Sequence, residues 1–226
     1  FDKDNLNRLA GAGVTAFALE AAPRTTRAQS MDVLSSQANI AGYKAVMIGA
    51  SQYQRLMPML MTAAGTIKAG RVVILGVGVA GLQAIATAKR LGAVIEASDV
   101  RPSVKEQVES LGGKFIDVSY ETAEEKEAAE GVGGYAKPMP PSWLERQKVE
   151  VAKRVAQADI VISTALIPGR AAPTLITEAM VQSMKPGSVI VDMAAPAGGN
   201  CPLTEAGKTV VKHGVTIVGE TNIPAL

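Results

Sequence analysis

Short apolar segments alternate with longer amphipathic segments over the last two-thirds of the chain. The apolar segments are rich in β-branched residues and apolar on both faces, which is typical of parallel strands covered by helices. We expect strands at residues 72–75, 94–97, 114–118, 160–163, 189–193 and 215–218. We expect helices at residues 80–91, 103–111, 142–157 and 176–184. This alternation predicts an α/β fold with a Rossmann-type, doubly wound parallel sheet.

The first 70 residues follow a different pattern. Residues 14–19 predict a strand, and Ala21-Ala22-Pro23-Arg24 breaks it. Thr26 and Gln29 have the spacing of a capping box, which would start a long helix over residues 28–50. We expect a second helix at 52–64 and a linker at 65–70. We interpret this part as the remnant of a second α/β subdomain.

Residues 119–142 predict a long loop. Glutamates are frequent between residues 121 and 130, and a run rich in Gly and Pro follows up to residue 141. Long loops in compact domains are usually functional or disordered. This one is either a solvated surface insert or a mobile lid whose Tyr135 reaches a ligand.

Composition limits the possible functions. The chain has 226 residues, of which 47% are hydrophobic and 19% charged, and this excludes intrinsic disorder. A net charge of +2 does not favour nucleic acid as a partner. The single Cys201 allows no disulfide within the chain, and the single His213 excludes a metal site built from several histidines. We expect no metal.

Glycines interrupt the longest apolar stretch, residues 72–88, so we expect a strand, a turn and a helix there rather than membrane insertion. The chain opens on Phe1 without an initiator Met or leader, and it closes on Leu226 without a charged tail. We therefore expect it to be an internal piece of a longer protein.

Gly76, Gly78 and Gly81 form a GxGxxG motif that follows a predicted strand and opens a predicted helix, and Asp99 ends the next strand. This context is the fingerprint of a dinucleotide site, because the glycines let the pyrophosphate approach the N–H groups of the helix. The Asp99 carboxylate suits the ribose hydroxyls of NAD(H) and would repel the 2′-phosphate of NADP(H). Arg101 complicates this choice, because a nearby Arg can serve a 2′-phosphate.

Further candidates for cofactor binding surround this motif. Ala80 and Val100 adjoin the glycines and Asp99. The loops after two later strands, residues 163–169 and 192–200, should supply the nicotinamide side, with Ala165 as a candidate. The alternative is that these are two ordinary loops at strand ends.

Several stretches together resemble a known family. Residues 24–37 read RTTRAQSMDVLSSQ and residues 134–137 read GYAK, and these are the most specific stretches; others are 61–66, 76–82, 105–108, 111–112, 164–169 and 198–201. The chain resembles the NAD(H)-binding domain I, in the alpha subunit, of proton-translocating NAD(P)⁺ transhydrogenase, within the alanine dehydrogenase/transhydrogenase family. The resemblance covers nearly the whole chain.

The resemblance implies roles for individual residues. Arg24, Gln29 and Asp32 would be catalytic and would also hold the cofactor: Asp32 would bind the carboxamide, Gln29 would align the two nicotinamides and Arg24 would anchor the loop. The remaining cofactor-binding candidates that the resemblance implies are Ser35, Val79, Gly134, Tyr135, Gln147 and Leu166. Asp32 and Ser35 could instead be polar helix positions, Arg24 a surface cation and Gln147 a solvent-facing residue.

It also implies a domain organisation and a reaction. Residues 1–65 would end an N-terminal subdomain and carry the loop beside the nicotinamide, residues 66–222 would be the NAD-binding Rossmann domain, and residues 223–226 would start a truncated C-terminal segment. Hydride would pass reversibly from NADH here to NADP⁺ on a separate domain III, and a membrane domain would couple this to proton movement. The implied protein is a homodimer and a peripheral part of a membrane complex, on the cytoplasmic side of the bacterial inner membrane or in the mitochondrial matrix.

Two alternatives stay open. Alanine dehydrogenase shares the fold and many of these motifs, but its oxidative deamination needs a carboxylate just before the Gly-Gly of the last strand loop, where residues 194–197 read AAPA. A non-catalytic NAD-binding module is excluded only by the specific loop at residues 24–35.

Overall fold

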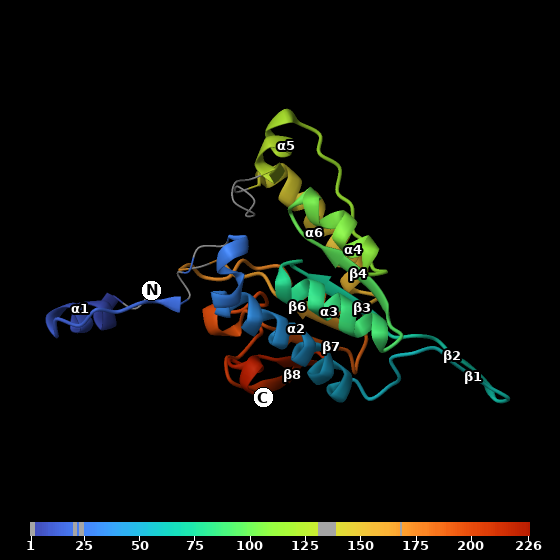
Figure 1. The fold of residues 1–226 in the computed structure, drawn as a ribbon. Helices are drawn as coiled ribbons and strands as arrows, with labels where there is room; N and C mark the ends of the chain where they lie inside the picture. The colour runs from blue at the N-terminus through green and yellow to red at the C-terminus, as the bar shows by residue number, and fades with distance from the viewer. Residues whose placement is uncertain (1–2, 20–21, 23–24, 131–138, 168) are drawn as a thin grey trace.

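A computed structural model describes residues 3–19, 22, 25–130, 139–167 and 169–226. Its centre is a seven-stranded sheet of order β5-β4-β3-β6-β7-β9-β8 (Figure 1). The strands β3 to β7 and β9 are parallel, and β8 is antiparallel to β9. Their bounds are β3 Arg71–Leu75, β4 Val94–Ser98, β5 Lys114–Phe115, β6 Ile160–Ser163, β7 Val189–Asp192, β8 Thr209–Lys212 and β9 Val215–Val218. This confirms the predicted α/β class and the largely parallel sheet.

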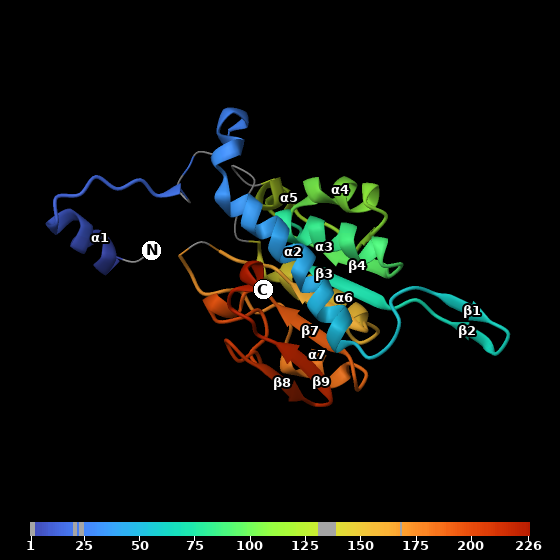
Figure 2. The ribbon, with the colours of Figure 1, turned by 60° about the horizontal axis from the view of Figure 1, so that its bottom comes forward.

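Helices cover both faces of the sheet because successive strand residues point to opposite sides. Ile74 of β3 packs with Ile162 of β6 under α2 (Val33–Gln52) and α3 (Val79–Arg90). Val73 and Val161, one position along, pack on the other face under α6 (Pro141–Val155) and α7 (Glu178–Ser183). The two central strands β6 and β7 are therefore buried along their whole length, which is why their sequence is apolar without alternation. Figure 2 shows α2 and α3 on the same face.

The long helix α2 runs antiparallel to the strands it covers. Gly42 lies against Ala80 at the start of α3, and a Cβ at position 42 would overlap the carbonyl oxygen of Ala80. Gly49, two turns later, lies against Ile160, the first residue of β6. Because α2 passes from the carboxyl edge of the sheet to the amino edge between these glycines, its N-terminal turns extend beyond the carboxyl edge.

Most element bounds of the sheet region agree with the sequence prediction, and two do not. The 114–118 strand is only two residues long. The antiparallel edge strand β8 was not predicted; its residues alternate between exposed and half-buried. His213 and Gly214 join β8 to β9 with φ angles of 53° and 77°, the positive values of a tight hairpin turn.

The first 70 residues depart further from the prediction. Residues 14–18 form no strand, and the unpredicted helix α1 (Lys3–Gly11) has no buried residue. The long helix begins at Val33 rather than at residue 28, after a 3-10 turn η2 (Thr26–Met31). The predicted helix at 52–64 is wrong: the segment contains Pro58, which lacks an N–H donor, and it leads into the exposed hairpin of β1 (Leu60–Thr62) and β2 (Gly65–Ile67). Figures 1 and 2 show α1 and this hairpin projecting from opposite sides.

The apolar stretch at residues 72–88 divides into β3, a glycine turn and α3, as its glycines predict. Among the residues described, no helix has the length and apolar character needed to cross a bilayer.

The segment predicted as one long loop contains a helix. Residues 123–130 form α5, and α5 packs on the start of α6 around Trp143, which stacks on Tyr120 at 5.8 Å between ring centroids. The remainder of the segment, residues 131–138, lies outside the described residues. Buried Glu125 joins the two helices by accepting hydrogen bonds from Ser142 and Arg146 of α6.

Burial by itself would raise the pKa of the Glu125 carboxyl. Hydrogen bonds from the Glu121 N–H, the Arg146 guanidinium and the Ser142 hydroxyl outweigh that effect and lower the pKa from 4.5 to about 2. A folded pKa below the unfolded value means that the carboxylate stabilises the fold above about pH 4.5 and loses this contribution as the pH falls toward 2.

We therefore predict that Glu125→Gln lowers the free energy of unfolding at neutral pH, and that its difference from wild type shrinks between about pH 4.5 and pH 2. Urea unfolding followed by the fluorescence of Trp143, the single tryptophan, measures this difference. Glu124→Gln, an exposed position of the same helix, is the control and should change little. A Glu125→Gln difference that is independent of pH would contradict the assignment.

Candidate functional site

The candidate residues meet at the carboxyl edge of the parallel sheet. Gly76 follows β3, Asp99 follows β4 and Thr164 follows β6, while Asp192 is the last residue of β7. The chain order reverses here, because β3 has β4 on one side and β6 on the other. In open α/β sheets such a switch point is where ligands bind.

The three glycines of the loop between β3 and α3 have different surroundings. Gly76 has φ +92°, and a Cβ there would lie 2.7 Å from the Thr164 hydroxyl. A Cβ at Gly81 would overlap the carbonyl oxygen of Gly76, so α3 sits directly on the turn. A Cβ at Gly78 would have nothing within 4 Å. The loop is thus packed against protein on two sides and open at Gly78, beside the N–H groups of Val79 and Ala80 at the positive end of α3.

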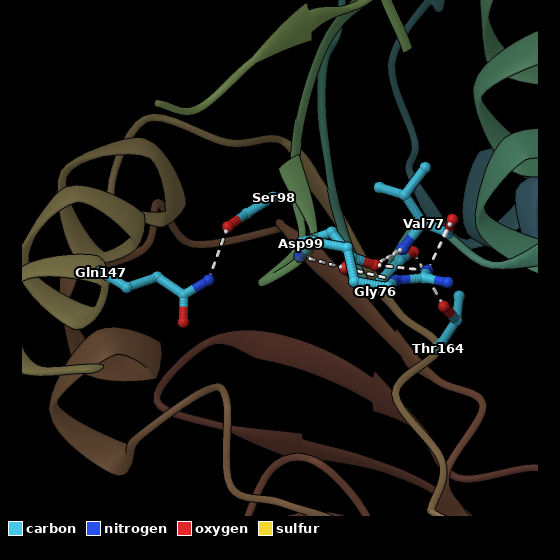
Figure 3. A network of polar contacts seen from close by, with 7 residues as sticks. Gly76, Val77, Ser98, Asp99, Gln147 and Thr164 are labelled. Atoms are coloured by element: carbon cyan, nitrogen blue, oxygen red, sulfur yellow. Dashed lines mark hydrogen bonds and ion pairs between the residues drawn. The ribbon is translucent and has the colours of Figure 1, made fainter. Parts of the chain in front are cut away.

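Asp99 binds the glycine loop from the end of the neighbouring strand. Its Oδ2 accepts the Val77 N–H at 2.8 Å (Figure 3). Its Oδ1 accepts the N–H of Arg101 at 2.9 Å. The Arg101 side chain adds Nε to Oδ1 at 2.9 Å and a terminal nitrogen to Oδ2 at 3.0 Å. The Asp99 side chain is 8% exposed and that of Arg101 is 25% exposed.

Residues on neighbouring elements complete this half of the site. Thr164 donates its hydroxyl to the carbonyl of Gly76 at 2.9 Å, and Gln147 of α6 donates to the hydroxyl of Ser98 at 3.2 Å (Figure 3). Gln147 is therefore directed toward the end of β4 rather than toward solvent. Val100 packs against the cluster around Trp143.

A second carboxylate, Asp192, organises the loops after β6 and β7. Its side chain is fully buried and accepts five hydrogen bonds of 2.6–3.2 Å from neutral donors: Ser163 Oγ, Ala194 N–H, Asn200 N–H, Cys201 N–H and Thr204 Oγ1. Asn200, also fully buried, binds both the N–H and the carbonyl of Ala165. Asp192 holds the backbone of Asn200, and the Asn200 side chain in turn holds Ala165 in place. Leu166, the next residue, is half exposed.

The residues before α2 lie on the same side of the sheet. Asp32 is the N-cap of α2: its Oδ1 accepts the Ser35 N–H at 2.9 Å, and its Oδ2 accepts the Ser35 hydroxyl at 2.6 Å. Gln29 is exposed in the preceding 3-10 turn. Asp32 comes ten residues before Gly42, which corresponds to about 15 Å along the helix axis. Because α2 extends past the carboxyl edge, this end of the helix stands beyond the glycine loop. The helix is capped by Asp32 rather than by the predicted capping box, because Thr26 and Gln29 both lie inside the 3-10 turn that precedes it.

Three candidates, Arg24, Gly134 and Tyr135, lie outside the described residues. Burial raises the pKa of the Cys201 thiol, which leaves it protonated at neutral pH. His213 lies in the β8–β9 turn and contacts Glu178 at 3.1 Å. Within the described ranges, no three His, Cys, Asp or Glu residues are grouped as a metal site would require.

The sequence did not single out Asp192, Thr164 or Asn200 as side chains that organise the site. For Asp192 and Thr164 one signal was present. A carboxylate or hydroxyl that directly ends a buried apolar strand lies at the edge where the loops meet, and burial there requires hydrogen-bond partners.

Comparison with known proteins agrees with this geometry. The family described as alanine dehydrogenase/PNT, C-terminal domain, matches residues 45–226, and the chain belongs to this family. An NAD(P) transhydrogenase subunit alpha polypeptide of Rhodospirillum rubrum is 62% identical over 212 residues, which cover 94% of this chain and 54% of that protein. Alanine dehydrogenase of Bacillus subtilis is 32% identical over 220 residues, which cover 94% of this chain and 51% of that enzyme.

Among solved structures, the transhydrogenase from Sinorhizobium meliloti superposes with a TM-score of 0.86 and 53% identity, covering 99% of this chain and 59% of that one. The chain therefore spans about half the length of the curated relatives that it matches. The resemblance to the transhydrogenase alpha subunit, within a family shared with alanine dehydrogenase, is confirmed.

We predict that Asp192→Asn lowers the free energy of unfolding by about 3 kcal/mol, because an amide in this buried position confronts N–H and O–H donors with a donor of its own. Urea unfolding measures the loss. Glu220→Gln is the matched control: one oxygen of Glu220 accepts the N–H groups of Thr221 and Asn222 at the surface, and the amide oxygen can keep both. If the two substitutions lowered the free energy of unfolding equally, the buried network around Asp192 would contribute no more to stability than a surface hydrogen bond.

Proposed function

We propose that this chain forms the NAD(H) site of a proton-translocating transhydrogenase. The observation that carries the proposal is the glycine loop at the switch point of the sheet, open at Gly78 and bound by Asp99 through the Val77 N–H. The helix α3 directs unpaired N–H groups at this opening, where a pyrophosphate would bind. Asp99 would bind the adenosine ribose and so favour NAD(H) over NADP(H). Val79, Ala80, Val100, Arg101 and Gln147 would line the adenosine side.

The nicotinamide would extend toward the N-terminal end of α2. Ala165 and Leu166 would contact it from the loop after β6, which Asp192 and Asn200 hold rigid. By family membership, Asp32 would hold the carboxamide with Ser35, Gln29 would align the ring and Arg24 would anchor the loop. The cap that Asp32 makes on Ser35 supports this, because it fixes the carboxylate at the helix end. Gly134 and Tyr135 would close over the site.

The proposed reaction moves a hydride from NADH directly to NADP⁺ bound on a partner domain. No proton enters or leaves at the reacting carbons, so close approach and exclusion of water are the requirements, rather than a general acid or base. The described site suits this chemistry, because the carboxylates of Asp99 and Asp192 are both engaged in hydrogen bonds that hold loops.

Alanine dehydrogenase is the second candidate, since its sequences match most of this chain. Amino-acid oxidation needs a carboxylate before Gly198-Gly199. Residues 195–197 there form a 3-10 turn of Ala, Pro and Ala, which offers no acid or base. This observation favours the transhydrogenase.

The wider organisation follows from the same proposal. Residues 66–222 would be the NAD-binding domain, residues 1–65 would end a preceding subdomain and residues 223–226 would begin a returning segment. The partners would be an NADP-binding domain III, a membrane domain and a second copy of the chain. The β1–β2 hairpin, which leaves Met61 75% exposed and Ile67 48% exposed, supports an association of copies. The protein would be peripheral to the membrane, on the cytoplasmic or matrix side.

The decisive assay mixes the full-length protein with an NADP-binding domain III. We predict that NADH reduces a spectrally distinct analogue of NADP⁺ in this mixture without any added amino acid, because the hydride passes between two bound nicotinamides. Alanine with NAD⁺, and pyruvate with ammonia and NADH, are expected to give no turnover.

Turnover that requires alanine or pyruvate would instead establish the dehydrogenase. Binding of NADH without turnover in either assay, with an active transhydrogenase as positive control, would leave the chain a non-catalytic NAD-binding module and overturn the proposed reaction.

A further inference from the structure

The carboxylate of Asp99 has every acceptor position filled by protein donors. An ionised carboxylate offers about four lone-pair sites, two on each oxygen. Backbone N–H groups take one on each oxygen: that of Arg101 on Oδ1 and that of Val77 on Oδ2. The Arg101 side chain takes the second on each oxygen, through Nε and a terminal nitrogen. A ribose diol therefore meets a carboxylate with no free acceptor.

The two pairs of hydrogen bonds differ in how easily they can be given up. The backbone donors belong to the glycine loop and to the turn before η3 (Pro102–Val104), so they stay in place as long as the fold does. The other two donors, by contrast, belong to the long and flexible Arg101 side chain, which is a quarter exposed. Its departure would free one lone pair on each oxygen, and those are the two acceptors that a pair of adjacent hydroxyls needs.

We propose that the Arg101 guanidinium occupies the two acceptor positions of Asp99 that the adenosine ribose diol would use, and that it leaves Asp99 when NAD(H) binds. This inference rests on the proposed NAD(H) site and adds a residue that sets its affinity and specificity. The guanidinium competes with the diol, so it weakens NADH binding. It also neutralises Asp99, so it reduces the repulsion that this carboxylate exerts on a 2′-phosphate.

The geometry also accounts for where the side chain is held. One terminal nitrogen of Arg101 donates to the carbonyl of Val77 at 3.1 Å as well as to Asp99. The guanidinium thus bridges the glycine loop and the strand end, the two parts of the chain between which the adenosine would bind. It keeps a nearly buried carboxylate paired while no nucleotide is present, which avoids the cost of an uncompensated charge.

The test replaces Arg101 with Met, which fills similar space but donates no hydrogen bond, in the full-length protein. We expect Arg101→Met to bind NADH about five-fold more tightly and NADPH about five-fold more weakly, the size expected when a partly exposed ion pair stops competing. Arg101→Lys, which keeps the charge but fewer donors, should fall between Met and wild type. Fluorescence titration with each reduced nucleotide measures all these affinities.

Arg71→Met is the matched control. Arg71 makes an ion pair of the same 2.9 Å length with Glu96, but at the amino end of β3, away from the glycine loop. Its loss removes the same charge and should leave both nucleotide affinities unchanged.

An NADH analogue with 2′-deoxyadenosine offers one hydroxyl fewer to Asp99. The increase in affinity caused by Arg101→Met should therefore be clearly smaller for this analogue than for NADH.

Two results would overturn the inference. Weaker NADH binding by Arg101→Met would mean that the guanidinium contacts the bound nucleotide, and an equal gain for NADH and the deoxy analogue would mean a general charge effect. Both leave the proposed function intact. Failure of the wild-type protein to bind NADH at all would instead remove the proposed function itself.

Discussion

The hydrogen bond from the Val77 N–H to the Asp99 carboxylate is the contact on which the proposed site depends. It joins the glycine loop after β3 to the end of β4, 22 residues later in the chain. Parallel strands make this possible, because their carboxyl ends lie at one edge and bring sequence-distant loops together. Gly76 and Gly81 let the loop turn closely enough for Val77 to reach the carboxylate, and Gly78 leaves the opposite side open.

Two carboxylates at strand ends thus organise two halves of one edge, by different means. Asp192 is fully buried and bound by five neutral donors, so its network is a permanent part of the fold. Asp99 has two backbone donors, and its remaining acceptor positions are taken by the side chain of Arg101, which we propose is exchanged for a ligand. The permanent network holds Ala165 on the proposed nicotinamide side, and the exchangeable one lies on the proposed adenosine side.

The sheet and its glycine loop could be predicted from the sequence, because buried parallel strands leave apolar runs and the GxGxxG motif falls between a strand and a helix. The edge strand β8 could not, since half-exposed residues carry no such signal. The hairpin at residues 60–67 and the 3-10 turn at 26–31 also escaped prediction, because local propensity does not decide their structure. Asp99 was found from spacing alone, whereas its occupation by Arg101 depends on side-chain geometry that no spacing reveals.

The affinity of Asp99→Asn for NADH, measured by fluorescence titration beside its free energy of unfolding, tests the proposed site at its key contact. We expect NADH affinity to fall about ten- to hundredfold, the size of a lost hydrogen bond to a charged group, while the variant still unfolds cooperatively. NADPH affinity should not fall with it, because the repelling charge is gone. A folded Asp99→Asn variant that binds NADH as tightly as wild type would contradict the assignment of Asp99 as the ribose ligand.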